Sequence, residues 1–341
     1  MEEESRRGAG PRRVAVVTGA TGGVGRATAR TLAAKGYDVA LLGRGEAGLR
    51  GAADDVLARG GQALAIKVDV ADWDQVRAGA EQTEDRLGPI DVWINNAMLT
   101  VFGPVSTLTA DEIRRSTEAT YLGQVHGALA ALEHMSPRDR GTIVSVSSTL
   151  AYRSIPLQAA YCGGKAAARG FMESLRTELL HEGSAIRVTQ VVLPAVNTPQ
   201  FGWSRSRMPH QPRPVAPIYH PDVIARAIVR AAETAPRQRV IGTWNRMVLA
   251  LNKLAPGVLD HFAALSSWEG QQVEGSPSSV RPGNLEEPLD DQPGADAGAT
   301  GTFTDQAGGV LTPAFLRSLP HLAQTVGRGA VARAREIAGL R

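Results

Sequence analysis

Residues 14–25 read VAVVTGATGGVG, a short apolar run followed by a turn that contains four glycines. Apolar residues at helical spacing continue over 25–35 and end at Gly36, so the stretch predicts a strand, a tight turn and a helix. Such a turn needs glycine because its backbone bends sharply and approaches a ligand closely, while the N–H groups that begin the helix attract negative charge. We therefore expect the pyrophosphate of a dinucleotide at Gly19, Thr21, Gly22, Gly23, Val24 and Gly25.

The alternation of strand and helix patterns continues to about residue 245. Apolar runs predict further strands over 38–42, 63–68, 90–95, 142–147, 186–193 and 239–242. Helical spacing predicts helices over 46–59, 72–87, 110–135, 157–181 and 221–234. Because helices that connect parallel strands cross over with one hand, this order predicts an α/β fold with a doubly wound parallel sheet of the Rossmann type.

The composition of the chain predicts how it is divided. We expect a flexible N-terminus over 1–11, the main domain over 12–245, and an apolar segment over 246–268 that covers the cleft or joins an interface. Residues 269–312 are rich in Gly, Pro, Ser and acidic side chains and predict a low-complexity linker, because they contain too few apolar groups to offset the entropy of ordering. Residues 313–341 predict a C-terminal basic helix, either solvated or in contact with a partner or a membrane.

Composition and charge exclude several classes of protein. The chain has 341 residues, 43% of them hydrophobic, which is enough for a large core. A net charge of +3 without a concentrated basic face argues against a nucleic-acid partner. A single cysteine, Cys162, excludes an internal disulfide, and the seven histidines lack metal-ligand spacing, so we expect no metal. The sequence shows no signal-like N-terminus and no transmembrane run of about 18 apolar residues, so we expect a cytoplasmic protein.

The residues that follow the second strand predict which dinucleotide binds. An acidic residue there would accept a hydrogen bond from the adenosine 2′-hydroxyl and select NAD. Gly43 instead leaves room for a 2′-phosphate and Arg44 can pair with it, so we expect NADP (NADPH). NAD is the alternative, with Arg44 as an exposed loop residue. The residues after the next two strands would flank the adenine and its ribose: Asp69, Val70, Asn96 and Ala97.

Three polar residues are predicted to meet at the same edge of the sheet. Tyr161 and Lys165 stand four residues apart, on one face of a predicted helix. Ser148 precedes Tyr161 by thirteen residues and follows the predicted strand 142–147, at the carboxyl edge where α/β sheets bind ligands. A phenol, an ammonium group and a hydroxyl therefore converge beside the expected nicotinamide, as an acid–base site requires.

These motifs together resemble those of the classical short-chain dehydrogenase/reductase family, over residues 12–245. The matching elements are the glycine-rich turn, Asn95-Asn96-Ala97, Ser148, Tyr161-x-x-x-Lys165 and residues 194–198, which read PAVNT. The resemblance implies that the main domain is catalytic and interconverts an alcohol and a carbonyl on a small molecule by direct hydride transfer. It also implies a homo-oligomer.

The resemblance implies a role for each matched residue. Tyr161 would act as general acid or base, and Lys165 would bind the nicotinamide ribose and lower the phenol pKa from about 10. Ser148 would orient the substrate oxygen. The nicotinamide would lie beside Pro194, Val196 and Thr198, with the Thr198 hydroxyl on its carboxamide.

Three positions depart from the family pattern. Thr120 stands where the family has an asparagine that holds a relay water, so its hydroxyl would hold that water or the relay is rearranged. Met98 follows Asn-Asn-Ala in place of glycine, and either narrows the cavity or fills core. Ala195 replaces glycine after Pro194, which is a mild change.

Other interpretations stay open. The adjacent Gly22 and Gly23 also suit the extended branch of the superfamily, but the position of Ser148 and the low-complexity C-terminal part argue against it. A second alternative is a non-catalytic NADP-binding module whose tail recruits a partner. A third is a membrane-surface enzyme, in peripheral contact with lipid through residues 247–262 or through the tail.

Overall fold

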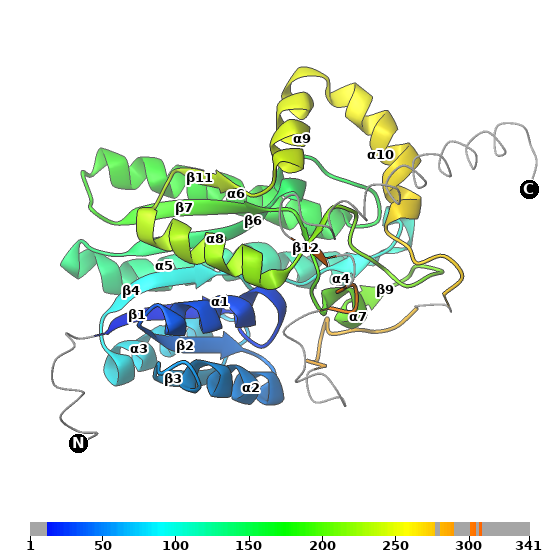
Figure 1. Cartoon of the computed structure of the whole chain (residues 1–341). Coiled ribbons are helices and arrows are strands. Elements are labelled where there is room, and N and C mark those ends of the chain that lie inside the picture. Colours follow the sequence, from blue (N-terminus) through cyan, green and yellow to red (C-terminus); the bar gives the residue numbers. More distant parts are fainter. Residues whose placement is uncertain (1–11, 277–279, 290–300, 305–306, 309–341) are drawn as a thin grey trace, which may run out of the picture.

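A parallel sheet forms the centre of the protein. The computed structural model describes residues 12–276, 280–289, 301–304 and 307–308. Within these residues the central sheet has seven strands, all paired in parallel, in the order β11-β7-β6-β4-β1-β2-β3 (Figure 1). The strands are β1 (Arg13–Thr18), β2 (Tyr37–Gly43), β3 (Ala63–Lys67), β4 (Ile90–Asn95), β6 (Thr142–Ser148), β7 (Arg187–Leu193) and β11 (Gln238–Val240). The order runs outward from β1 in both directions, which confirms the predicted doubly wound sheet.

Helices cover both faces of this sheet (Figure 1). One face carries α1 (Gly23–Ala34), α2 (Glu46–Leu57) and α8 (Pro221–Thr234), and the other carries α3 (Trp73–Leu87), α5 (Gly123–Met135) and α6 (Ala159–His181). Ala15 and Val17 of β1 point into the first core, while Val14 and Val16 point into the second. A strand buried on both sides must be apolar at every position, which is why β1 reads as a continuous apolar run.

The single helix predicted over 110–135 is instead interrupted. α4 (Ala110–Thr117) passes into a π-helical turn, η3 (Glu118–Leu122), before α5 begins. Within this turn the hydroxyl of Thr120 accepts a hydrogen bond from the Leu99 amide and donates one to the Leu99 carbonyl. Helical spacing alone does not distinguish a π turn from an α turn, so the sequence did not reveal the interruption.

Two segments after β7 enclose the carboxyl edge of the sheet. The first, here called the lid, covers residues 200–219 and contains α7 (Gln200–Trp203), β9 (Arg205–Ser206) and β10 (Ile218–Tyr219). It is joined to the domain where β9 pairs with β5 (Val101–Phe102) and β10 pairs with β8 (Ala195–Val196). The second consists of α9 (Thr243–Leu254) and α10 (Pro256–Gly270), which project from the body of the domain (Figure 1). This pair lies at the place where the sequence predicts an apolar segment, and its inner side lines the cleft.

The described residues beyond α10 differ from the predicted linker. Gln271 and Leu285 have no exposed surface, and Arg281 exchanges two backbone hydrogen bonds with Ser206. Further along, β12 (Ala307–Gly308) pairs with β10. The composition concealed these contacts because most of them use backbone groups, which any sequence supplies, and isolated side chains such as Leu285 produce no periodicity.

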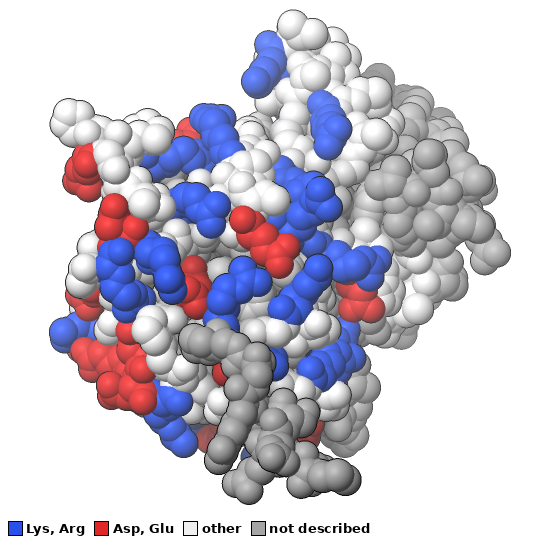
Figure 2. All heavy atoms as spheres, turned by 60° about the vertical axis from the view of Figure 1, so that its left-hand side comes forward, with Lys and Arg blue, Asp and Glu red and all other residues white. Residues whose placement is uncertain are grey.

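Several expectations concern parts of the chain that the structure does not describe. The N-terminus 1–11 and the basic helix 313–341 lie outside the described residues. Among those described, no helix combines the length and the apolar character that a membrane span requires. Figure 2 shows basic and acidic side chains interspersed over the face that it presents, so that face has no uninterrupted basic region for a polyanion.

Candidate active site

A cavity of 480 Å³ opens at the carboxyl edge of the sheet, beneath the lid and the inner side of α9 and α10. Most of the predicted site residues line it: Gly19, Thr21, Gly22, Gly23, Val24, Arg44, Asp69, Val70, Asn96, Ala97, Ser148, Tyr161, Lys165, Pro194, Val196 and Thr198. Gly25 and Thr120 do not. Residues that are far apart in sequence are therefore brought to one continuous surface, as the parallel sheet predicts.

The glycine-rich turn forms one wall of this cavity and requires its glycines. Gly19 and Gly23 have φ angles of 65° and 52°, in the left-handed region that favours glycine. A Cβ on Gly25 would overlap the Gly19 carbonyl, so this glycine permits close packing although it does not line the cavity. The Asn96 side chain donates to the carbonyls of Thr18 and Gly19 at 3.0 and 3.2 Å. A turn held open in this way leaves the start of α1 free for a pyrophosphate, so these residues fit a dinucleotide.

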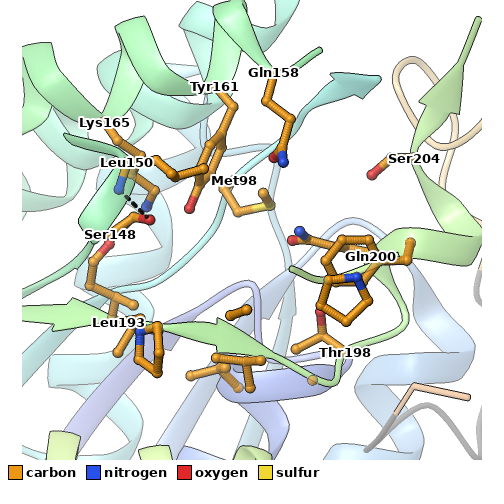
Figure 3. A pocket seen from close by; sticks show the side chains of 18 of the residues that line it. Met98, Ser148, Leu150, Gln158, Tyr161, Lys165, Leu193, Thr198, Gln200 and Ser204 are labelled. Atoms are coloured by element: carbon orange, nitrogen blue, oxygen red, sulfur yellow. Dashed lines mark hydrogen bonds between the residues drawn. The ribbon is translucent and has the colours of Figure 1, made fainter. Parts of the chain in front are cut away.

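Ser148, Tyr161 and Lys165 lie together on one side of the cavity, with Thr198 and Gln200 on the other (Figure 3). Ser148 ends β6, and its hydroxyl accepts a hydrogen bond of 3.1 Å from the Leu150 amide. The Tyr161 phenol, on the first turn of α6, is hydrogen-bonded to Ser148. Lys165 follows one turn later, where its ammonium group donates to the Val146 carbonyl at 2.7 Å. The helical spacing of four residues therefore brings both side chains against the end of β6.

The electrostatics of this group differ from the sequence-based expectation. Burial raises the pKa of Tyr161 to about 12, although the hydrogen bond with Ser148 acts in the opposite direction. Burial also lowers the pKa of Lys165 to about 7. The Lys165 nitrogen lies 5.8 Å from the centre of the Tyr161 ring. The lysine therefore does not lower the phenol pKa below 10, because desolvation dominates both groups.

Thr120 lies behind the cavity wall and is absent from its lining. Its side chain is fully buried, and its hydroxyl is used in both directions by the Leu99 backbone. The methyl group of Thr120 lies against α6 near Gly164. The π turn thus directs the hydroxyl to the Leu99 backbone, which favours the second alternative, a rearranged relay. A relay role for Thr120 stays a prediction.

Two arginines lie at the adenosine end of the cavity, although the sequence predicted only one. Arg44 follows β2, and Arg115 of α4 forms a short ion pair with Asp69. Arg44 lies 4.0 Å from the same carboxylate. Asp69 is therefore shared between two cations. Arg115 was missed because it lies on an amphipathic helix with several charged neighbours, where one arginine carries no distinguishing signal.

The end of the cavity beyond Tyr161 is apolar. Met98, the residue after Asn-Asn-Ala, lines it, so of the two alternatives Met98 faces the cavity (Figure 3). The lid and the α9–α10 pair supply most of the remaining surface: Phe201, Trp203, Pro214, Val215, Trp244, Met247, Val248, Leu251, Leu259 and Phe262. No motif marks these residues, because a pocket wall needs only apolar surface and loops can supply it at any spacing.

A buried carboxylate attaches the lid to the domain. Glu112 is 2% exposed, lies in the first turn of α4, and accepts hydrogen bonds from Arg207 at 2.7 Å and Arg205 at 3.2 Å. It also completes a capping box with Thr109. Burial acts to raise the pKa of Glu112, but the bonds from Arg207, Thr109 and Arg205 outweigh it and hold the pKa at about 2.

We expect Glu112→Gln to destabilise the protein in a pH-dependent way. Because the pKa of Glu112 is lower in the folded chain than its ordinary value of 4.5, its contribution is complete above pH 4.5 and is lost as the pH falls toward 2. The free energy of unfolding should fall by up to roughly 3 kcal/mol at neutral pH. The decrease should be smaller than this upper bound because water screens the partly exposed Arg207. Urea titrations between pH 2 and 7 measure this.

The matched control for this prediction is Glu81→Gln. Glu81 is half exposed and forms an ordinary i,i+4 ion pair with Arg77 on α3, which we expect to contribute little. Equal pH dependence of stability in the wild type and Glu112→Gln would show that Glu112 does not attach the lid.

The comparisons with known proteins agree with this arrangement. A family model described as short chain dehydrogenase matches residues 13–208. The uncharacterized oxidoreductase YxnA of Bacillus subtilis (strain 168) is 32% identical over 270 residues, which cover 79% of this chain and 76% of that protein.

Two solved structures are similar over most of their own length. A short-chain dehydrogenase from Streptomyces avermitilis is 28% identical, with a TM-score of 0.63, over 74% of this chain and 96% of that one. An alcohol dehydrogenase from the archaeon Thermococcus sibiricus, in complex with 5-hydroxy-NADP, is 27% identical, with a TM-score of 0.58, over 67% of this chain and 95% of that one.

Proposed function

The chain belongs to the short-chain dehydrogenase family of oxidoreductases, and from this premise we propose that it is an NADP(H)-dependent enzyme that interconverts an alcohol and a carbonyl. The observation that carries the proposal is the group formed by Ser148, Tyr161 and Lys165 on one side of a cavity (Figure 3) that a glycine-rich turn also lines. A protein that only bound the dinucleotide would not need a buried phenol and a buried ammonium group beside it, and this argues against the non-catalytic alternative.

The proposed roles follow from where each polar atom can act. When bound, the nicotinamide supplies the hydride that is added to the substrate carbon in reduction, or accepts it in oxidation. Tyr161 donates its phenol proton to the substrate oxygen in reduction and takes it back in oxidation. Ser148 donates a hydrogen bond to the same oxygen and so fixes its distance from the phenol. Lys165 holds the ribose end of the cofactor, and its charge stabilises the phenolate that Tyr161 leaves after donation.

We assign the cofactor as NADP(H) on the basis of the adenosine end of the cavity. A Cβ on Gly43 would meet the Thr21 side chain at 2.7 Å, so the end of β2 has no space for a side chain directed at the ribose. Arg44 lines this end of the cavity, and Arg115 shares the Asp69 carboxylate with it. Guanidinium groups bind phosphate through paired, charge-assisted hydrogen bonds, so this pair would suit a 2′-phosphate. The complex of the Thermococcus sibiricus enzyme with 5-hydroxy-NADP supports this assignment.

Replacing Arg44 with aspartate tests the cofactor assignment. We expect the variant to lose about 1–3 kcal/mol of NADPH affinity relative to NADH, the range for hydrogen bonds to a charged group. The measurement is fluorescence titration of the wild type and the variant with both cofactors. The ratio of the two affinities is the quantity to compare, because a general disturbance of the cavity weakens both cofactors equally.

The control for this experiment is Arg50→Asp, which makes the same charge change at an exposed position on α2. An unchanged NADPH to NADH ratio in Arg44→Asp would remove Arg44 from the cofactor site. A wild type that binds NADH more tightly than NADPH would keep the catalytic group and overturn the choice of cofactor.

The apolar end of the cavity supports an apolar substrate. Aromatic and aliphatic side chains from the lid, α9 and α10 surround the space beyond Tyr161, where a carbonyl compound would place its substituents. A reductase screen with NADPH should therefore begin with hydrophobic ketones and aldehydes. Homo-oligomer formation, cytoplasmic location and peripheral membrane contact stay predictions.

A further inference from the structure

Residues 280–289 cross from the lid to the adenosine end of the cavity, and we call them the strap. Their first half is fastened to the lid. Arg281 exchanges backbone hydrogen bonds with Ser206, and its guanidinium group donates to the carbonyls of Ser204 and Phe201. The Asn284 amide donates to the Trp203 carbonyl at 2.8 Å. The first half of the strap is therefore held by the lid.

The second half of the strap covers the two arginines of the adenosine end. Arg44 donates to the carbonyls of Leu285 and Glu286 at 3.2 and 2.8 Å, and also to the Asn284 carbonyl. Arg115 donates to the Leu285 carbonyl at 3.3 Å and lies 4.0 Å from the Glu286 carboxylate. Oxygen atoms of the protein itself thus occupy the donors that would bind a phosphate.

The side chain of Leu285 completes this cover. It has no exposed surface and packs in the same core cluster as Val68, Val70 and Leu99. Val70 is one of the residues expected to contact adenine. The strap therefore contributes an apolar side chain to the core cluster that includes Val70, and oxygen atoms to Arg44 and Arg115.

We propose that the strap is an autoinhibitory segment, which occupies the adenosine 2′-phosphate subsite and must leave it before NADP(H) binds. The inference rests on the proposed function, because NADP(H) is taken as the ligand of Arg44. Two features make the docked strap and the phosphate compete. The three carbonyl oxygens occupy N–H groups on both terminal nitrogens of Arg44, which leaves fewer of its five donors for a phosphate, and the Glu286 carboxylate would repel the phosphate at short range.

Competition of this kind lowers the apparent affinity for the cofactor. The apparent Kd equals the intrinsic Kd divided by the fraction of molecules whose site is free, so a strap that is docked in nine molecules of ten raises the Kd about tenfold. Phosphate forms stronger, charge-assisted bonds with arginine than a carbonyl does, so NADPH can displace the strap.

Leu285→Ser tests the proposal in the full-length protein, because it removes the apolar anchor without altering either arginine. We expect the Kd for NADPH, measured by fluorescence titration, to fall about tenfold. Val280→Ser is the matched control: it changes an aliphatic residue of the same strap to serine, but at a position that is 67% exposed, and should leave the Kd unchanged.

A second variant displaces the strap from its other end. Gly283 has a φ of 63°, and a Cβ there would overlap the backbone at Ser204 and Arg205, so Gly283→Ala should also tighten NADPH binding. Gly275→Ala is its control, because Gly275 has a φ of 69° but open space around it. Thermal unfolding of every variant establishes that it is folded before titration.

The possible results separate the strap from the proposed function. Unchanged or weaker NADPH binding in both Leu285→Ser and Gly283→Ala overturns the autoinhibitory strap but leaves NADP(H) as the cofactor. If neither the wild type nor any variant binds NADPH or NADH, the cofactor assignment fails, and the strap as its competitor fails with it.

Hydrogen exchange gives a second readout of strap position. The backbone amides of Arg281 and Asn284 should exchange faster when NADPH is added. Slower exchange would mean that the strap closes over the cofactor, contrary to the proposal.

Discussion

Replacing Tyr161 with phenylalanine should reduce turnover of a carbonyl substrate by roughly 10²–10⁴-fold, the usual contribution of a general acid or base. The substitution removes one oxygen atom and leaves the ring, so the cavity keeps its shape and the Kd for NADPH should change little. Steady-state kinetics with NADPH, together with fluorescence titration of the cofactor, measure the two quantities separately.

The pH dependence of the wild type gives the same prediction a second test. Because burial raises the pKa of Tyr161 to about 12, the phenol keeps its proton throughout the neutral range, as a proton donor in reduction must. Alcohol oxidation needs the phenolate, so its rate should rise with pH wherever the phenol titrates. The phenylalanine variant should lose this rise.

Tyr152→Phe is the matched control for Tyr161→Phe. Tyr152 lies outside the cavity, and its hydroxyl accepts a hydrogen bond of 2.7 Å from Gln238. Its loss should cost about 1 kcal/mol of stability and leave turnover unchanged. Near-wild-type turnover in Tyr161→Phe would mean that another group donates the proton.

The sequence predicted the sheet well, because its strands are buried on both faces. β1 is apolar at every position from Val14 to Val17, and a short apolar run followed by glycines has few other interpretations. The convergence of Ser148, Tyr161 and Lys165 was predictable for a related reason. Ser148 lies at the end of a strand, and the spacing of Tyr161 and Lys165 is that of one helical turn, so local geometry alone brings them to the same edge.

The features that the sequence did not predict depend on contacts between distant backbone groups. Thr120 had the right residue type for a water-binding role, but the π turn directs its hydroxyl to the Leu99 backbone. The strap over 280–289 resembled a linker because a single leucine anchors it and carbonyl oxygens make its bonds to Arg44. Since every residue has a carbonyl, no pattern of side chains marks such a contact.

The sequence also could not predict the pKa values of Tyr161 and Lys165. The pattern placed Lys165 beside Tyr161 and suggested that its charge would lower the phenol pKa. How deeply both groups are buried is decided by the packing of α6 on the end of β6, and burial shifts each pKa against its charged form. The charge states of Tyr161 and Lys165 therefore depend on the surroundings that a bound cofactor or substrate gives them.

Replacing Lys165 with methionine should reduce turnover by about 10²–10³-fold, the cost of losing one charged group that stabilises developing negative charge. The same variant should be more stable than the wild type at neutral pH. Burial lowers the pKa of Lys165 from 10.5 to about 7, which means that the folded chain disfavours its charge. Methionine has a similar volume and no charge to bury, and the Val146 carbonyl keeps a long hydrogen bond of 3.4 Å from Gln124.

The pH dependence of the free energy of unfolding tests whether the buried charge of Lys165 causes this difference in stability. Between pH 7 and 10.5 the unfolded wild type binds a proton at Lys165 that the folded chain does not, so its free energy of unfolding should rise with pH in this window. Below pH 7 both forms are charged and the penalty is constant. The methionine variant lacks this rise, so the difference in unfolding free energy between the two proteins should shrink as the pH increases.

The matched control is Lys35→Met, at an exposed position after α1, which should follow the wild type in both turnover and stability. A methionine variant less stable than the wild type at every pH would show that Lys165 supports the fold and is not held there at a cost for catalysis.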